Sequence, residues 1–248
     1  MLGSHETTAY DLRFNLLYVP VRVSPWFWLI MAIISGQDDL KGVGLFVACA
    51  FASILVHEFG HGLSSRALGL EPTQIVLHGM GGYCEYSGWH RDRVRRILVS
   101  LSGVAAGFAF LGIVLAVSAS VYGARPADLM AVIGIGPGNP VPALNRIGYF
   151  LGSPAGIAIL FLMEINFWWG VLNLLPIWPL DGGRVAETGL EWVNPVQATR
   201  WAHMASIGVA AAVALWLVQH GQPRTAVWLA YFAYLNFQAL QSTNRFSR

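Results

Sequence analysis

Two histidines and a glutamate near residue 60 have the types and the spacing needed to hold a zinc ion and use it. The sequence reads His-Glu-Phe-Gly-His over residues 57–61. On a helix, His57 and His61 lie four residues apart on one face, where both imidazoles can bind one zinc ion. Glu58 lies between them, where its carboxylate can act as a general base toward water. This run therefore predicts a catalytic metal centre.

The composition and position of the run argue against a chance match. With seven His and seven Glu in 248 residues, a random match is expected roughly 0.005 times per chain. The preceding stretch, Gly42 to Val56, has no charged side chain and reads as a membrane-spanning helix. Ionisable groups at membrane depth are costly and by default mark a functional site. A structural pair of core histidines is the alternative, but it gives no reason for Glu58 between them.

The composition indicates an integral membrane protein. The chain is 55% hydrophobic and 11% charged, with a mean hydropathy of +0.54, whereas soluble domains carry about 25% charged residues. We therefore expect the lipid bilayer to surround it. A net charge of +2 gives no reason to expect nucleic acid as a partner. Because no long polar stretch could form a second domain, we expect a single membrane domain over residues 1–248.

Six apolar segments predict an all-α polytopic membrane protein with about six transmembrane helices. The fourth segment is too long for one straight helix, so we expect its last part to be irregular. Between the second and third segments, Thr73 to Ser87 has two β-favouring runs around a glycine-rich turn, which predicts a β-hairpin. The segments run from about Val23 to Ser35, Gly42 to Ser65, Ile97 to Gly123, Ile147 to Leu180, Trp201 to Val218 and Thr225 to Leu240.

The basic residues predict how these segments are oriented. If the N-terminus is cytoplasmic and all six segments cross, eleven Arg side chains lie on the cytoplasmic side, and four Arg or Lys side chains lie outside. This distribution agrees with the positive-inside rule. Both termini are then cytoplasmic. The second segment descends towards the cytoplasm, so His57 and His61 lie in the cytoplasmic half of the bilayer.

A second polar segment at matching depth can complete the metal site. A catalytic zinc ion takes three protein ligands and water, and the fourth segment ends in Asn-Leu-Leu-Pro-Ile-Trp-Pro-Leu-Asp-Gly-Gly-Arg, residues 173–184. The two prolines break the helix, and Gly182-Gly183 lets the backbone turn sharply behind Asp181. Irregular backbone is tolerated in a membrane only where protein buries it or a water-filled cavity receives it. The alternative is that this run only caps a span.

Together, the two motifs resemble those of the site-2 protease family of intramembrane zinc metalloproteases. The resemblance implies one zinc ion per chain, bound by His57, His61 and Asp181. It also implies that Glu58 activates water and that Asn173 helps to hold substrate or to stabilise charge near the metal. The implied activity is hydrolysis of peptide bonds in transmembrane protein substrates, within or near the membrane, in regulated proteolysis.

The family also has a hairpin that dips into the membrane after the first motif, and residues 73–87 fall in that place. The resemblance therefore implies a short membrane-associated β-hairpin. A helical substrate must be unwound locally before attack, and an exposed strand edge can hold the unwound segment by β-augmentation. We expect Ile75, Val76 and Leu77 to face or pair with substrate.

The resemblance covers about residues 42–184 and has departures. Some relatives carry a PDZ domain or a nucleotide-sensing module, and we expect neither here. The Gly-Pro-x-x-Asn segment of many family members is replaced by Ser102–Gly107, without Pro or Asn. An inactive scaffold of the same family, binding transmembrane helices, is the alternative function, but it gives no reason to keep Glu58 with the full ligand set. His78 and His90 flank the predicted hairpin and are rival metal ligands.

Overall fold

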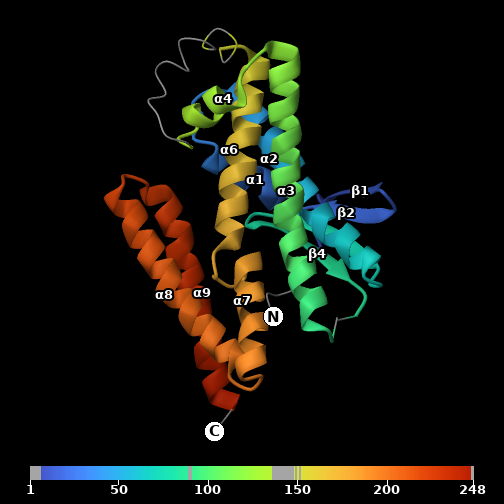
Figure 1. Cartoon of the computed structure of the whole chain (residues 1–248), viewed down its shortest axis with the longest axis vertical. Helices are drawn as coiled ribbons and strands as arrows, with labels where there is room; N and C mark the ends of the chain where they lie inside the picture. Colours follow the sequence, from blue (N-terminus) through green and yellow to red (C-terminus); the bar gives the residue numbers. More distant parts are fainter. Residues whose placement is uncertain (1–6, 89–90, 136–147, 149, 151, 247–248) are drawn as a thin grey trace. The chain divides into compact units, whose positions relative to one another are not determined.

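The computed structural model describes residues 7–88, 91–135, 148, 150 and 152–246. Within this part the chain is mostly helical and carries one small β-sheet (Figure 1). Two compact units are formed, one by residues 1–89 with 105–170 and the other by residues 90–104 with 171–248. The helices are α1 (Pro25–Ile34), α2 (Leu40–Ala67), α3 (Arg93–Tyr122), α4 (Pro126–Val132), α6 (Pro154–Leu174), α7 (Asp181–Val193), α8 (Ala198–Gln219) and α9 (Pro223–Phe246).

The first unit contains a four-stranded sheet in the order β1-β2-β3-β4. The predicted hairpin is confirmed as β3 (Pro72–His78) and β4 (Gly81–Tyr86), which pair antiparallel. A second hairpin, β1 (Leu12–Leu16) and β2 (Val19–Val23), was not predicted. Strand β2 of this hairpin pairs with β3 in parallel, with Val21 opposite Ile75 and Val23 opposite Leu77. The sheet therefore joins the N-terminal segment to the segment that follows α2.

Helices α1 and α2 leave this sheet and return to it. Strand β2 ends immediately before α1, α2 is followed by β3, and the two strands are paired. The enclosed core contains side chains from both helices and the sheet, including the fully buried Phe27, Ile54 and Leu77. Burying each of these side chains stabilises the folded protein by about 1.5–3 kcal/mol. The core fixes the C-terminal half of α2 against the sheet.

Four of the described helices, α2, α3, α6 and α8, are long and apolar enough to cross a bilayer. The chain is therefore an integral membrane protein of mostly helical fold. Helix α1 has 10 residues and is about 15 Å long, half of the roughly 30 Å hydrocarbon core. Helix α9 has 24 residues but is less apolar than those four. Six crossings remain a prediction.

Helices α2 and α6 pack against each other in the first unit. The rings of Phe46 and Phe161 meet edge to face, with centroids 5.3 Å apart. Asn166 Nδ2 donates to Ser53 Oγ at 2.8 Å, and both residues are buried. Polar bonds of this kind hold the register of membrane helices. Because Ser53 lies one turn before His57, the bond fixes the position of the His-Glu run along α6.

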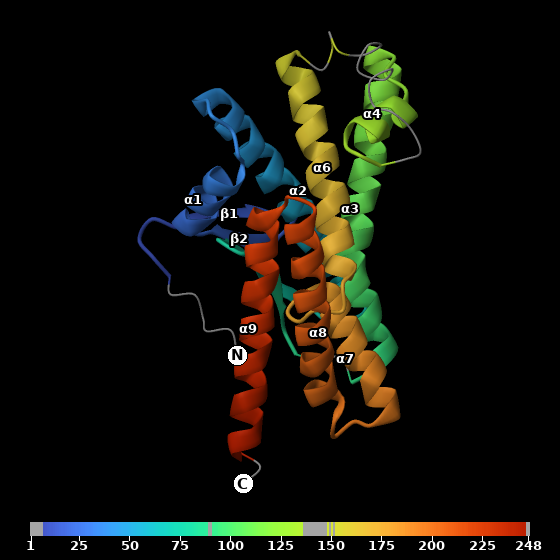
Figure 2. The same cartoon turned by 90° about the vertical axis from the view of Figure 1, so that its left-hand side faces the viewer.

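In the second unit, α8 and α9 form an antiparallel hairpin. The turn between them contains Gly221 at a positive φ of 73°, a conformation that glycine adopts without strain. Figure 2 shows the two helices side by side, in orange and red. The predicted irregular end of the fourth segment is also confirmed, because α6 stops at Leu174 and α7 begins only at Asp181.

Candidate metal centre

The two motif histidines converge on one point in the first unit. Both lie on α2, and their Nε2 atoms are 3.2 Å apart. The rings are nearly perpendicular, at 81°, and both side chains are buried. The four-residue spacing on a helix produces this arrangement, as the sequence predicts. Two ring nitrogens that face each other in a buried site are suited to share a metal ion.

Glu58 is buried beside this pair and lies against β4. A methyl group placed on Gly82 would lie 2.7 Å from Glu58 Cγ and 2.8 Å from Glu58 Oε1. One turn further along α2, a methyl group on Gly62 would lie 3.4 Å from Cys84 Sγ. Strand β4 therefore runs along the motif turn of α2. Gly82 was not singled out from the sequence, because it is one of several glycines in a predicted turn.

Cys84 is a half-buried residue of β4 and lies next to the motif helix α2. Burial raises the pKa of the Cys84 thiol to about 12, and the negative charges of Glu58 and Glu85 act in the same direction. The thiol is therefore neutral at physiological pH.

The prediction that Ile75, Val76 and Leu77 offer a free strand edge is wrong. All three belong to β3 and are 0% exposed. Strand β3 is paired with β2 on one side and β4 on the other, so its backbone groups are already used. The edge strand next to the motif is β4 instead. The prediction fails because β2 of the N-terminal hairpin, which was not predicted from the sequence, occupies the other edge of β3.

The second motif lies in the second unit and builds the start of α7. Asp181 is the first residue of α7 and is buried, and Asn173 is buried in the last turn of α6. The loop between them folds on itself, since Ile177 N–H donates to Leu175 O at 2.7 Å and Leu180 N–H donates to Ile177 O at 2.8 Å. Asp181 is therefore presented by a compact loop and a helix N-terminus.

The role predicted for Gly182 and Gly183 needs correction. Both are helical residues of α7 and do not form a sharp turn. A Cβ on Gly182 would lie 2.3 Å from Leu174 O, and one on Gly183 would lie 2.5 Å from Trp178 N. These distances are far below van der Waals contact with backbone atoms. The glycines are needed because the first turn of α7 packs directly on the loop backbone.

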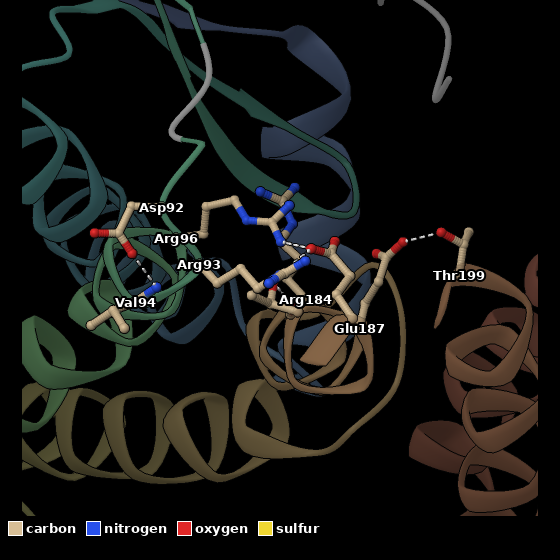
Figure 3. Close-up of polar contacts among 9 residues, drawn as sticks. Asp92, Arg93, Val94, Arg96, Arg184, Glu187 and Thr199 are labelled. Carbon is tan, nitrogen blue, oxygen red and sulfur yellow. Dashed lines mark hydrogen bonds and ion pairs between the residues drawn. The ribbon is translucent and has the colours of Figure 1, made fainter. Parts of the chain in front are cut away.

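Ionic and polar contacts fix α7 from its other end (Figure 3). Glu191 accepts hydrogen bonds from Arg93 and Arg96 at the start of α3, and Thr199 Oγ1 donates to Glu187 at 2.7 Å. Burial alone would raise the pKa of the Glu191 carboxyl, but the hydrogen bonds from Arg96 and Arg93 hold that pKa below its usual value. Helix α7 is thus fastened at both ends within the second unit.

The rival ligands predicted from the sequence do not gain support. His78 lies at the end of β3, where its Nδ1 accepts from Met80 N–H at 3.2 Å and its ring lies against Tyr83. One of its ring nitrogens is therefore used by the hairpin turn. His90 lies outside the described residues.

Comparisons with known proteins agree with this geometry. The profile of Peptidase family M50 matches residues 150–216. A candidate zinc metalloprotease of Synechocystis is 28% identical over 189 residues, and a zinc metalloprotease of Methanocaldococcus jannaschii is 24% identical over 181 residues. These alignments cover 70% and 71% of this chain but 42% and 44% of the relatives. The chain therefore spans less than half the length of these curated relatives.

A solved structure shows the same fold. The site-2 protease from Methanocaldococcus jannaschii superimposes with a TM-score of 0.57 at 18% identity, covering 92% of this chain and 95% of that one. The profile match contains Asn173 and Asp181, and the relatives are named as zinc metalloproteases. The chain is therefore similar to Peptidase family M50 over residues 150–216 and to curated zinc metalloproteases, and it shares the fold of a solved site-2 protease.

Proposed function

We propose that this chain is an intramembrane zinc endopeptidase that cuts transmembrane proteins. The observation that carries the proposal is the pair of buried imidazoles on α2, 3.2 Å apart at Nε2, with Glu58 between them in the chain. A scaffold that only binds helices has no use for this combination. The names of the relatives and the family profile support the same chemistry.

The donor set fits one zinc ion. Imidazole nitrogens and a carboxylate oxygen are ligands that zinc prefers, and we propose His57, His61 and Asp181 as the three protein ligands. Asp181 is suited to this role because it is buried at a fixed helix start. When bound, the zinc ion polarises the scissile carbonyl group and lowers the pKa of a water molecule towards neutrality.

The side chains around the ion handle the proton and the developing charge. The Glu58 carboxylate accepts the proton of the attacking water and passes it to the leaving amine nitrogen. Its burial, 3% exposed, keeps bulk water from competing for that proton. Asn173 carries an amide N–H group that can donate to the carbonyl oxygen as negative charge develops there.

Strand β4 supplies the place where substrate is held. A transmembrane helix hides its peptide bonds, so the segment to be cut must be extended before attack. An extended segment can add to the edge of β4 as a further strand, and β4 runs past Glu58. The substrate-binding role predicted for β3 therefore passes to residues 81–86. We propose single-span membrane proteins as substrates, in regulated proteolysis.

The membrane orientation follows from the sheet and the basic residues. Because β2 and β3 are paired, α1 must start and α2 must end on one side. The excess of arginine supports the cytoplasm as that side. We propose that α9 crosses the membrane with α8, and that α1 and the connection that follows it, residues 25–39, together supply the outward passage which α2 reverses. Both termini are then cytoplasmic, with the active site in the cytoplasmic half.

Zinc content and turnover test the proposal together. Wild-type protein should contain about one zinc ion per chain, and Asp181→Ala should lose it or bind it much more weakly. Glu58→Gln should retain zinc but cleave neither labelled casein nor a single-span reporter. Turnover of Glu58→Gln at the wild-type rate would refute the assignment of the base. Folded wild-type protein without zinc would favour an inactive scaffold.

A further inference from the structure

Two side chains of the C-terminal hairpin bind the backbone of the loop that precedes Asp181. The Trp178 N–H group donates to Ser206 Oγ of α8 at 2.9 Å. The Trp178 carbonyl oxygen accepts from Asn236 Nδ2 of α9 at 2.6 Å. Both backbone polar groups of one loop residue are thus held by side chains from two different helices.

The orientation of Asn236 is fixed by its surroundings. Its Nδ2 also donates to Phe232 O at 2.8 Å, so the amide nitrogen faces two carbonyl oxygens. Its Oδ1 then faces His203 Nδ1 at 2.6 Å. Because a carbonyl oxygen only accepts, the His203 proton must sit on Nδ1. The amide therefore has one orientation that satisfies every partner.

The hydrogen bonds of Ser206 and Asn236 to Trp178 are buried, so solvent water cannot replace them. Asn236 is 0% exposed and Ser206 is 1% exposed. In a membrane, non-helical backbone must find its partners within the protein. Residues 175–180 form such a backbone between α6 and α7. The two side chains supply the partners that a regular helix would otherwise provide.

The peptide held in this way touches the turn that carries Asp181. On its other side, the Ile177–Trp178 peptide packs against Gly183, where an added Cβ would lie 2.5 Å from both Ile177 C and Trp178 N. Leu180, next to Asp181, donates its N–H to Ile177 O at 2.8 Å. A shift of Trp178 must therefore move the first turn of α7.

We propose that Ser206 and Asn236 are positioning residues for the Asp181 carboxylate. They hold the Ile177–Trp178 peptide against α7 and thereby keep the carboxylate in the geometry that zinc requires. This inference rests on the proposed function, in which Asp181 is a zinc ligand. The C-terminal hairpin then supports the metal site as well as anchoring the chain in the membrane.

A matched pair of serines separates positioning from ordinary stability. Ser206 and Ser118 are both buried, and each donates to the carbonyl oxygen four residues earlier at 2.7 Å. Only Ser206 also accepts from the loop. In the full chain in detergent, Ser206→Ala should weaken zinc binding by about ten- to a hundredfold, as loss of supporting contacts does. Ser118→Ala should leave zinc affinity unchanged, and Ser206→Thr, which keeps the hydroxyl, should restore it.

Two further variants decide the remaining outcomes, with affinity measured by competition with a zinc chelator. Asn236→Leu, of similar size, should weaken zinc binding at least as much as Ser206→Ala. If Asp181→Ala loses zinc while Ser206→Ala and Asn236→Leu bind it like wild type, the positioning role is wrong and the ligand set stands. If Asp181→Ala keeps wild-type zinc affinity, both the positioning role and the assignment of Asp181 as a zinc ligand are wrong. If Asn236→Leu does not fold, the serine pair alone decides.

Discussion

An alanine at position 82 tests whether β4 keeps the Glu58 carboxylate in its working position. The added Cβ would lie 2.7 Å from Glu58 Cγ and 2.8 Å from Leu77 Cδ2, whereas ordinary contact begins at 3.4 Å. Both side chains must therefore move, by about 0.7 Å for Glu58 and about 0.6 Å for Leu77. Strand β4 is paired with β3 over its length, so the strand keeps its place and the Glu58 side chain is displaced.

The expected result is loss of turnover without loss of metal. A misplacement of about 1 Å at a reacting group costs roughly 100-fold, or about 2.7 kcal/mol in the barrier. Cleavage of labelled casein by Gly82→Ala should fall by about this factor. Zinc content should stay at one per chain, because neither His57 nor His61 changes.

A glycine on the same helix provides the control. An alanine at Gly44 of α2 would meet nothing within 4 Å, so Gly44→Ala should cleave casein like wild type. Wild-type turnover in Gly82→Ala would show that β4 does not confine Glu58. Loss of zinc in Gly82→Ala would show that the strand supports the metal ligands instead.

Three further variants test other parts of the structure. Gly183→Ala places a Cβ 2.5 Å from the loop backbone, so zinc affinity should fall and thermal stability should drop by about 1–3 kcal/mol; unchanged values would contradict the close packing. The lowered pKa of Glu191 predicts stability that is complete above about pH 4.3 and lost as the pH falls through the folded-state pKa. In thermal unfolding against pH, Glu191→Gln should lack this acid-dependent loss while Glu187→Gln keeps it. Asp11 pairs with the buried Arg22 at 3.1 Å, so Asp11→Ala should lower the melting temperature by removing this partner of the Arg22 charge, and an unchanged melting temperature would argue against a stabilising ion pair.

The parts of the site that depend on local geometry could be predicted from the sequence. Because His57 and His61 are four residues apart, the helix period places both on one face of α2. Their Nε2 atoms therefore come within 3.2 Å of each other without help from any other element. The prolines at 176 and 179 end α6 by the same kind of local rule. These features were predicted because each is decided within one turn of helix.

The parts that depend on distant contacts could not be predicted. Strand β2 contains Pro20 and the buried Arg22, which both argue against a strand in the sequence. The strand forms because it can pair with β3, far along the chain. Gly182-Gly183 is recognisable as a glycine pair, but a turn and a close backbone approach have the same sequence signature. Asn236 in an apolar helix was the one available signal for the contacts to Trp178.

The parallel pairing of β2 with β3 also sets an order of events during synthesis. Val21 is paired with Ile75, so β2 cannot acquire its partner until α1, α2 and the start of the second hairpin have been made. Helices α1 and α2 must therefore enter the membrane before the sheet closes behind them. Once closed, the sheet holds both ends of this helical pair. A proteolytic cut between Gly36 and Asp39 would then leave the two fragments associated, with the His-Glu run still against β4.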